Sequence, residues 1–323
     1  MVNNYTEMNQ VSVKDIYLPS NWSDIVFGLY IFGEVMAFPC YLFVFYHLLT
    51  HKTASTTLYN HTTLVMLFFN FISLTIDMPL ILSFMQRGVY IPFTPAVCLV
   101  HQFVNYGIWY AAIFSMIWLS LERHILIFHS SLTRTARGRC LFHYIPLAIF
   151  ALYAPVFYFY ITFIYPCERM YDAYTLVCGG PYYTCSFSQS LHWYVTIFHS
   201  SLPAPLIVII SGSLLLRVII QKRRLQRGNA WRQNRKMILQ FVFISATFII
   251  LDLPLSIDNI LRRIGVASAG TNIDLIVNQM SNVPAMVLPY ATAITLPKLK
   301  QKLRIVIFCK PTRHSVNASN QQT

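Results

Sequence analysis

The sequence predicts an all-α membrane protein, in which a bundle of seven transmembrane helices is followed by a short amphipathic helix. Two observations lead to this fold class. Of the 323 residues, 56% are hydrophobic and 11% are charged, whereas charged residues make up about 25% of an ordinary soluble domain. A bilayer core needs roughly 20 consecutive, mostly apolar residues per helix, and the chain has seven such stretches, at residues 25–49, 58–85, 96–128, 142–165, 192–220, 237–260 and 273–296.

The distribution of basic residues predicts the orientation of this bundle. If the N-terminus is outside, only five of the 24 Lys and Arg residues lie on the outer side, and they are Lys14, Arg87, Arg169, Arg262 and Arg263. Basic residues accumulate on the cytoplasmic side of membrane proteins. We therefore expect a multi-pass plasma-membrane protein with an extracellular N-terminus. The net charge of +13 then suits anionic membrane lipid and gives no reason to expect nucleic acid as a partner.

The two ends of the chain have separate predicted roles around a transmembrane domain at residues 25–297. Residues 1–24 form an extracellular segment without a signal-peptide pattern, and Asn4 and Asn21 begin Asn-x-Ser/Thr sequons there, so both are candidates for glycosylation. In residues 298–323, apolar side chains at helical spacing alternate with Lys and Arg, which predicts an amphipathic surface helix and a cytoplasmic tail. Cys309 is either a palmitoylation site or an unmodified thiol.

Prolines within the apolar stretches predict kinked helices, because an interior proline removes a backbone hydrogen bond. These prolines are Pro39, Pro79, Pro155, Pro203, Pro205, Pro254, Pro284 and Pro289. Kinked helices leave cavities and hinges between them. The alternative for any single proline is that it marks no hinge, since proline is commoner in membrane helices than in soluble ones.

Two motifs of the third stretch stand 25 residues apart. Cys98 lies at its start, and Arg123 lies at its cytoplasmic end in the triplet Glu122-Arg123-His124. The chain resembles the rhodopsin-like (class A) G-protein-coupled receptor family, in which a third-helix cysteine bridges to the second extracellular loop and an acidic-Arg-aromatic triplet ends the same helix. It is most similar to divergent invertebrate orphan members. The resemblance implies an extracellular small-molecule or peptide ligand and a heterotrimeric G protein as partners, with the triplet as the coupling site.

The same resemblance assigns a packing switch between these two sites. Phe248 stands six residues before Pro254, as in the sixth-helix pattern of the family, and Ile113 and Pro203 occupy its isoleucine and proline positions. Several positions depart from the family: Leu251 and Asp252 replace its cysteine and tryptophan, and Leu288-Pro289 with Thr292 replaces Asn-Pro-x-x-Tyr.

Other departures remove expected partners. Asn70 stands where a second-helix aspartate is usual, so we expect no buried sodium ion. Asn234 lies near the usual acidic partner of the third-helix arginine, so we expect no inactive-state ion pair there. The seventh stretch has no lysine before Lys298, which excludes a retinal Schiff base. No cofactor is therefore expected.

Four cysteines, Cys98, Cys167, Cys178 and Cys185, fall on the oxidising outer side, where three pairings are open to them. The resemblance implies that Cys98 bridges the loop after the fourth helix. The sequence leaves open whether Cys178 or Cys185 is its partner, and Cys167 takes the other. Cys40 and Cys140 are expected to be free.

Buried acids suggest where a ligand binds. An ionised side chain at a helix centre costs about 2.5–3.5 kcal/mol, so Glu34, Asp77 and Asp252 must face the bundle or water. One outward-opening cavity is predicted from Asp77, Asn105, Trp109, Asp252, Asn259, Asn278 and Asn282. We hypothesise that Asp77 or Asp252 pairs with the cationic group of an amine or a peptide. The alternative is interhelical hydrogen bonding, with one or both acids protonated.

The predicted function is therefore a G-protein-coupled receptor and not an enzyme. A transporter or channel is the first alternative, but the acids gather in the outer half and the inner half is sealed by apolar residues. A metal-dependent hydrolase is the second, because His47, His51, His61, His124, His129 and His143 lie near the inner face. Hydrolytic metals also need carboxylate support, and Glu122 is the only acid there, so no metal is expected.

Overall fold

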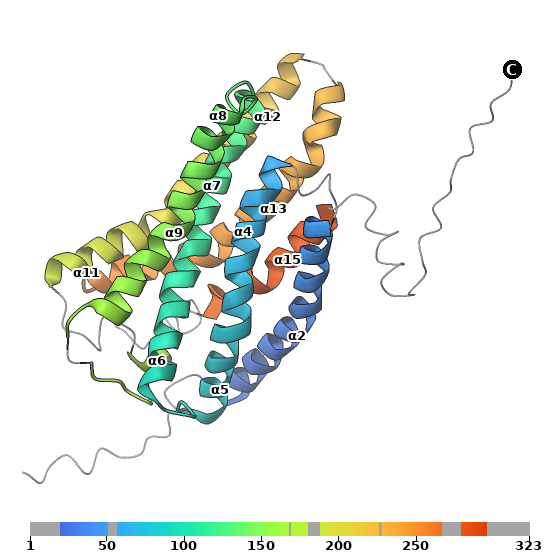
Figure 1. Ribbon diagram of the computed structural model, residues 1–323. Helices are drawn as coiled ribbons and strands as arrows, with labels where there is room; N and C mark the ends of the chain where they lie inside the picture. Colours follow the sequence, from blue (N-terminus) through green and yellow to red (C-terminus); the bar gives the residue numbers. More distant parts are fainter. Residues whose placement is uncertain are drawn as a thin grey trace, which may run out of the picture.

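The computed structural model describes residues 20–50, 57–167, 169–179, 188–225, 228–266 and 279–295, and all regular elements in these ranges are helical (Figure 1). Some predictions fall outside them: glycosylation of Asn4, the pairing of Cys185, the ligand contact of Asn278, and the amphipathic helix with Cys309. The side chains of Asn21 and Asn234 also lie outside the described part of the structure.

The described helices form seven consecutive segments of the bundle, and we call each segment a rod. The first three are α2 (Ser20–Thr50); α4 (Leu58–Ile72), η1 (Ser73–Asp77) and α5 (Met78–Arg87); and α6 (Pro95–Gln102), η2 (Phe103–Ile108) and α7 (Trp109–Phe128). The others are α8 (Ala136–Arg139), η3 (Cys140–Tyr144), α9 (Ile145–Phe159) and η4 (Tyr160–Ile164); α11 (Gln189–Val195), η6 (Thr196–Ser201) and α12 (Pro203–Leu225); α13 (Gly228–Arg263); and α15 (Val283–Thr295). A short 3-10 helix, η5 (Leu176–Gly179), precedes the fifth rod.

The lengths and composition of these rods confirm the predicted fold class. Within the described residues, six helices are long and apolar enough to cross a membrane, and Val283–Ile294 is a shorter apolar helix. Large apolar side chains such as Leu29, Val156, Ile209 and Ile294 are exposed on the outside of the bundle. A surface of this kind suits lipid and would be unfavourable in water.

Wide π-helical turns interrupt several rods just before a proline. Segments η1, η3 and η6 each end two residues before a proline, namely Pro79, Pro146 and Pro203, and each proline stands in the first turn of the following α-helix. Because proline has no N–H and its ring clashes with the carbonyl four residues earlier, the preceding turn widens. These interruptions agree with the prediction that prolines shape the helices.

The seventh rod departs from the predicted span. An uninterrupted helix over 273–296 is wrong at Ser281 and Asn282, which form a turn, and the described helix α15 begins at Val283. Pro284 explains the break, because it has no N–H to donate to the carbonyl four residues earlier and its ring clashes with that carbonyl. The turn is closed instead by a hydrogen bond from the Asn282 N–H to the Gln279 carbonyl, at 3.0 Å.

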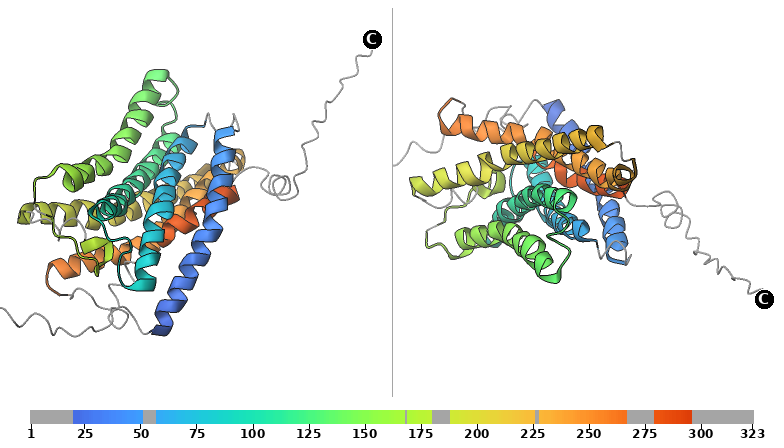
Figure 2. Two further views of the ribbon diagram at one scale, coloured as in Figure 1. Left: turned by 60° about the horizontal axis from the view of Figure 1, so that its bottom comes forward. Right: turned by 90° about the horizontal axis from the view of Figure 1, so that it is seen from above.

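Helix α7 occupies the centre of the bundle and packs against α4, α9 and α12 (Figures 1 and 2). On one side of the bundle, α2 packs against α15: the Tyr41 hydroxyl donates to the Ala285 carbonyl at 2.6 Å. Gly33 allows this approach, since a Cβ there would lie 2.7 Å from the sulfur of Met286. The first and seventh rods are therefore in direct contact.

Candidate functional site

A pocket lies between α7, η6, α12 and α13, and we call it the Asp252 pocket. Its lining residues are Trp109, Ile113, His199, Ser200, Pro203, Ala204, Ile207, Phe248, Ile249, Asp252, Leu255, Ser256 and Asn259. Three residues of the predicted ligand cavity, Trp109, Asp252 and Asn259, therefore meet here. Three of the predicted switch residues, Ile113, Pro203 and Phe248, form part of the same wall, while Pro254 lies within α13.

Asp252 is the carboxylate of this pocket. It stands on α13 with Ser256 and Asn259, four and seven residues later, so that the three share one helix face. Its side chain is only 6% exposed. Neither carboxylate oxygen has a hydrogen-bond partner among the described residues, and the Ser256 hydroxyl donates to the Asp252 backbone carbonyl instead, at 3.1 Å. The pocket thus contains a buried acid whose hydrogen-bonding capacity is unused in the described part of the chain.

His199 forms the opposite wall, and its hydrogen bonds are already made. Its Nε2 lies 2.8 Å from the Tyr153 hydroxyl and its Nδ1 lies 3.0 Å from the Tyr158 hydroxyl. The imidazole is surrounded by aromatic rings at centroid distances of 4.7–5.7 Å, from Tyr110, Phe114, Tyr153, Phe157, Tyr158 and Tyr194. Both ring nitrogens are therefore engaged by tyrosine hydroxyls, and the imidazole forms part of the pocket wall.

A second cavity of about 290 Å³ shares Trp109, Ile113 and Phe248 with the first, so these side chains separate the two spaces. Asn282 of the predicted set lines this second cavity, together with Asn70. No carboxylate is found among its described lining residues. The single predicted cavity is therefore two adjoining pockets, and one of them contains the acid.

Asp77 and Asn105, also predicted for the cavity, line neither pocket. Asp77 is buried in η1, with its Oδ1 2.9 Å from Nε2 of His101. The Asn105 side-chain amide donates to both carboxylate oxygens, at 3.1 Å each. Asp77 thus joins the second rod to the third. This is the interhelical hydrogen bonding that was the alternative to a ligand contact. His101 was not predicted as a partner of Asp77, although its spacing of four from Asn105 places both on one helix face.

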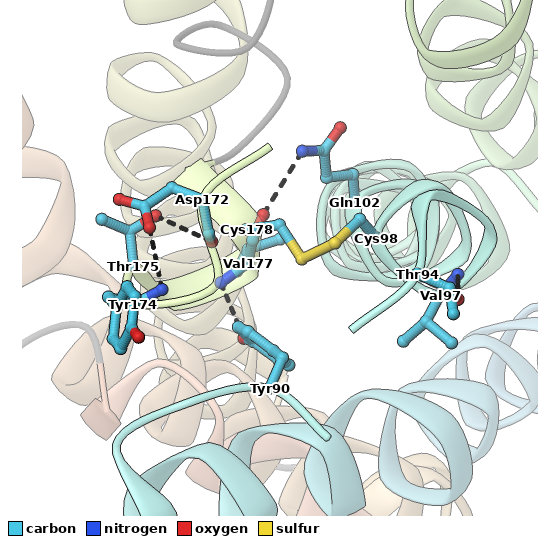
Figure 3. The surroundings of a disulfide bond; sticks show 10 residues. All are labelled: Tyr90, Thr94, Val97, Cys98, Gln102, Asp172, Tyr174, Thr175, Val177 and Cys178. Atoms are coloured by element: carbon cyan, nitrogen blue, oxygen red, sulfur yellow. Dashed lines mark hydrogen bonds between the residues drawn. A yellow bond between two sulfur atoms is a disulfide. The ribbon is translucent and has the colours of Figure 1, made fainter. Parts of the chain in front are cut away.

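The disulfide joins Cys98 to Cys178, with a Cα–Cα distance of 5.7 Å (Figure 3). This resolves the alternative left open by the sequence. Around it, the Val177 N–H donates to the Tyr90 hydroxyl at 2.8 Å, and the Gln102 amide donates to the Val177 carbonyl at 3.3 Å. The loop before the fifth rod is thereby fixed to the start of the third.

The other cysteines agree with their predicted states where they are described. Cys40 and Cys140 are free. Cys167 is also disulfide-bonded, and its expected partner Cys185 lies outside the described residues. The outer loop therefore contains at least two disulfide-bonded cysteines, Cys167 and Cys178.

The triplet Glu122-Arg123-His124 lies at the other end of α7. Arg123 is fully buried. The His124 Nε2 lies 2.9 Å from the Ile210 carbonyl and 3.2 Å from the Ser213 hydroxyl, both on α12. The Glu122 carboxylate is hydrogen-bonded to Nδ1 of His143 from η3. The three consecutive side chains therefore lie in different directions, with Glu122 and His124 contacting separate rods.

The histidines that suggested a metal site do not form one in the described part of the chain, where no group of three or more His, Cys, Asp or Glu side chains could hold a metal ion. His61 Nδ1 and His143 Nε2 are 3.3 Å apart, and Glu122 bonds the far side of the His143 ring.

Comparison with known proteins agrees with the seven-helix fold. The family model described as 7 transmembrane receptor (rhodopsin family) matches residues 42–294. The match begins within α2 and ends within α15, so it includes both pockets and the triplet. A search of curated proteins found no match for this chain.

Proposed function

The chain belongs to the rhodopsin family of seven-transmembrane receptors, and we propose that it binds a small organic cation in the Asp252 pocket and activates a heterotrimeric G protein through Glu122, Arg123 and His124. The receptor is a non-enzymatic signalling protein of the plasma membrane. Its N-terminus is extracellular, with glycosylation at Asn4 and Asn21, and Cys309 is palmitoylated at the inner leaflet.

The unused carboxylate of Asp252 is the observation that carries this proposal. An ionised carboxylate that is buried without a partner costs several kcal/mol. A ligand ammonium or guanidinium group would offset this cost by supplying the missing hydrogen-bond donors. The Trp109 ring lines the same pocket and offers a cation–π contact. The charge and chemistry of the pocket therefore favour a cationic ligand.

The position of the pocket favours a small molecule over a peptide. It is lined by side chains from three rods, and spaces between the helices of a bundle are typical sites for small ligands. Asn259 and Ser256 supply neutral polar groups for orientation, and Asn278 and Asn282 remain candidate contacts for larger ligands. Asp77 and Asn105 are assigned a supporting role, since they bond to each other beside the pocket.

Binding and coupling are linked through the shared wall. Ile113, Pro203 and Phe248 line the Asp252 pocket, and α13 continues past Pro254. A ligand that binds more tightly when α13 has moved about Pro254 shifts the population toward that state. Movement of α13 would uncover Arg123 for the G protein. The bound cation therefore acts on coupling through its differential affinity for the two states.

A direct test expresses the full chain in cells with a panel of G-protein reporters and a library of small organic amines. A response that is lost in Arg123→Ala, at equal surface expression, establishes receptor coupling. For an amine found in this way, Asp252→Asn should lower potency by about 100-fold, equivalent to about 2.7 kcal/mol. Asp172→Asn, which makes the same change at an exposed loop position, is the matched control. Unchanged potency in Asp252→Asn would exclude the proposed ion pair.

A further inference from the structure

Three titratable side chains from three rods form a hydrogen-bonded chain beside Arg123. We call it the inner histidine chain: His61 of α4, His143 of η3 and Glu122 of α7. His61 Nδ1 lies 3.3 Å from His143 Nε2, and His143 Nδ1 bonds the Glu122 carboxylate. His143 is fully buried and Glu122 is 1% exposed. The inner histidine chain therefore connects the second, third and fourth rods at the level of the triplet.

The chemistry of the three groups decides which atom donates and which accepts at each hydrogen bond of the inner histidine chain. An ionised carboxylate only accepts hydrogen bonds, so His143 Nδ1 must carry the proton that Glu122 receives. In a neutral imidazole the other nitrogen is then an acceptor, and His61 Nδ1 donates to it. The Tyr144 ring lies 4.6 Å from the ring of His143 and 6.1 Å from that of His61. These contacts restrict rotation of both imidazoles.

Glu122 depends on this one donor. Its second oxygen, Oε2, is buried and has no hydrogen-bond partner among the described residues. A buried carboxylate normally needs several donors, so the bond to His143 decides on which side of α7 the carboxylate lies. Successive helix residues point about 100° apart, and Arg123 lies inside the bundle while Glu122 is directed toward α4 and η3.

We propose that His143 is a positioning residue of the coupling site: it holds Glu122 toward η3 and so keeps the carboxylate from binding Arg123. The consequence for signalling rests on the proposed function. When His143 is removed, the buried carboxylate turns to the guanidinium of the next residue. A Glu122–Arg123 pair stabilises conformations in which Arg123 is buried and withheld from a G protein, so signalling falls.

The test of positioning is independent of any G protein. The full-length receptor is purified with ¹⁵N-labelled arginine, and the Arg123 Nε–H signal is assigned from its loss in Arg123→Lys. His143→Ala should shift this signal, and the shift should disappear in His143→Ala combined with Glu122→Gln, because the carboxylate is then absent. An unchanged Arg123 signal, or an equal shift in the double variant, overturns the proposal.

A conservative variant separates positioning from simple loss of packing. The side-chain N–H of asparagine can take the place of a histidine Nδ1–H, so His143→Asn should restore the wild-type Arg123 signal. Identical signals in His143→Asn and His143→Ala would contradict the proposal. His129→Ala, at an exposed histidine of the same end, is the matched control and should leave the signal unchanged.

Signalling provides the second measurement. In the reporter cells, His143→Ala should lower ligand-independent signalling roughly fivefold, with no further loss once Glu122→Gln is present. If the Arg123 signal shifts as expected while all reporters stay silent, positioning is supported and G-protein activation is not. If signalling is normal in His143→Ala, the inferred consequence of positioning is wrong. Failure of this proposal and failure of the proposed function are thereby distinguishable.

Discussion

Asp77 and Asp252 are both carboxylates buried within helices, but the structure surrounds them differently. Asp77 has an imidazole 2.9 Å from one oxygen and an amide bonded to both. Asp252 has no hydrogen-bond partner for either oxygen among the described residues and faces a cavity. Asp77 is part of the contact between two rods. Asp252 lacks a hydrogen-bond partner for its carboxylate among the described residues.

This difference separates a structural acid from a binding acid. A buried charge is tolerated where opposite charge and hydrogen bonds compensate for lost hydration. Asp77 obtains this compensation within the protein, so a ligand would have to displace His101 or Asn105 to use it. Asp252 has no such competitor in the described part of the chain. Burial in the membrane alone therefore does not identify the acid that contacts a ligand. The hydrogen-bond donors around each acid distinguish the two.

The largest expected effect follows from removing the paired acid. Asp77→Ala leaves His101 and Asn105 without their shared acceptor, and breaking a buried pair in this way should cost about 3 kcal/mol of stability. Thermal unfolding of the purified full-length receptor would measure this loss. Asp172→Ala, at an exposed acid, should change stability by less than about 0.5 kcal/mol. Equal stability in the two variants would mean that Asp77 is not a structural acid.

Much of the fold could be predicted because apolar length is a local property of the sequence. Each of the first six stretches corresponds to a described rod. The start of the seventh could not be read in the same way, because residues 273–296 remain apolar through a turn at Ser281 and Asn282. The signal for that turn was Pro284, but prolines elsewhere, such as Pro39 and Pro155, lie within continuous helices.

The site was less predictable because lateral contacts between helices are not local. Helical spacing indicated that Asp252 and Asn259 share a face, and the structure agrees. It could not indicate that Asp77 lies against His101, or that Trp109 and Phe248 divide the interior into two pockets. His143 was named only in the rejected metal-site alternative and His199 in no site, for the same reason: their partners come from other rods. The resemblance identified Cys98 and Arg123, whose surroundings only the structure describes.

A smaller effect is expected when Asp77 keeps one of its two partners. Asn105→Ala removes the amide that donates to both carboxylate oxygens, and loss of a hydrogen bond to a charged group should cost about 1.5–2 kcal/mol. In the Asp77→Ala background the same change should cost much less, since the acceptor is already gone. Thermal unfolding of the four proteins in this double-mutant cycle measures the coupling. Additive losses would show that Asn105 stabilises the receptor through another contact.

The smallest effect has the opposite sign and completes the comparison. Asp252→Asn replaces a buried acid that lacks a described partner by a neutral side chain of similar shape, so the ligand-free receptor should become more stable by about 1 kcal/mol. Thermal unfolding without added ligand measures this change, with Asp172→Asn as the control. A loss of stability would mean that Asp252 is compensated within the protein, as Asp77 is. A gain in stability together with weaker response to a cationic agonist would separate the two acids, since Asp77→Ala is expected to destabilise the protein.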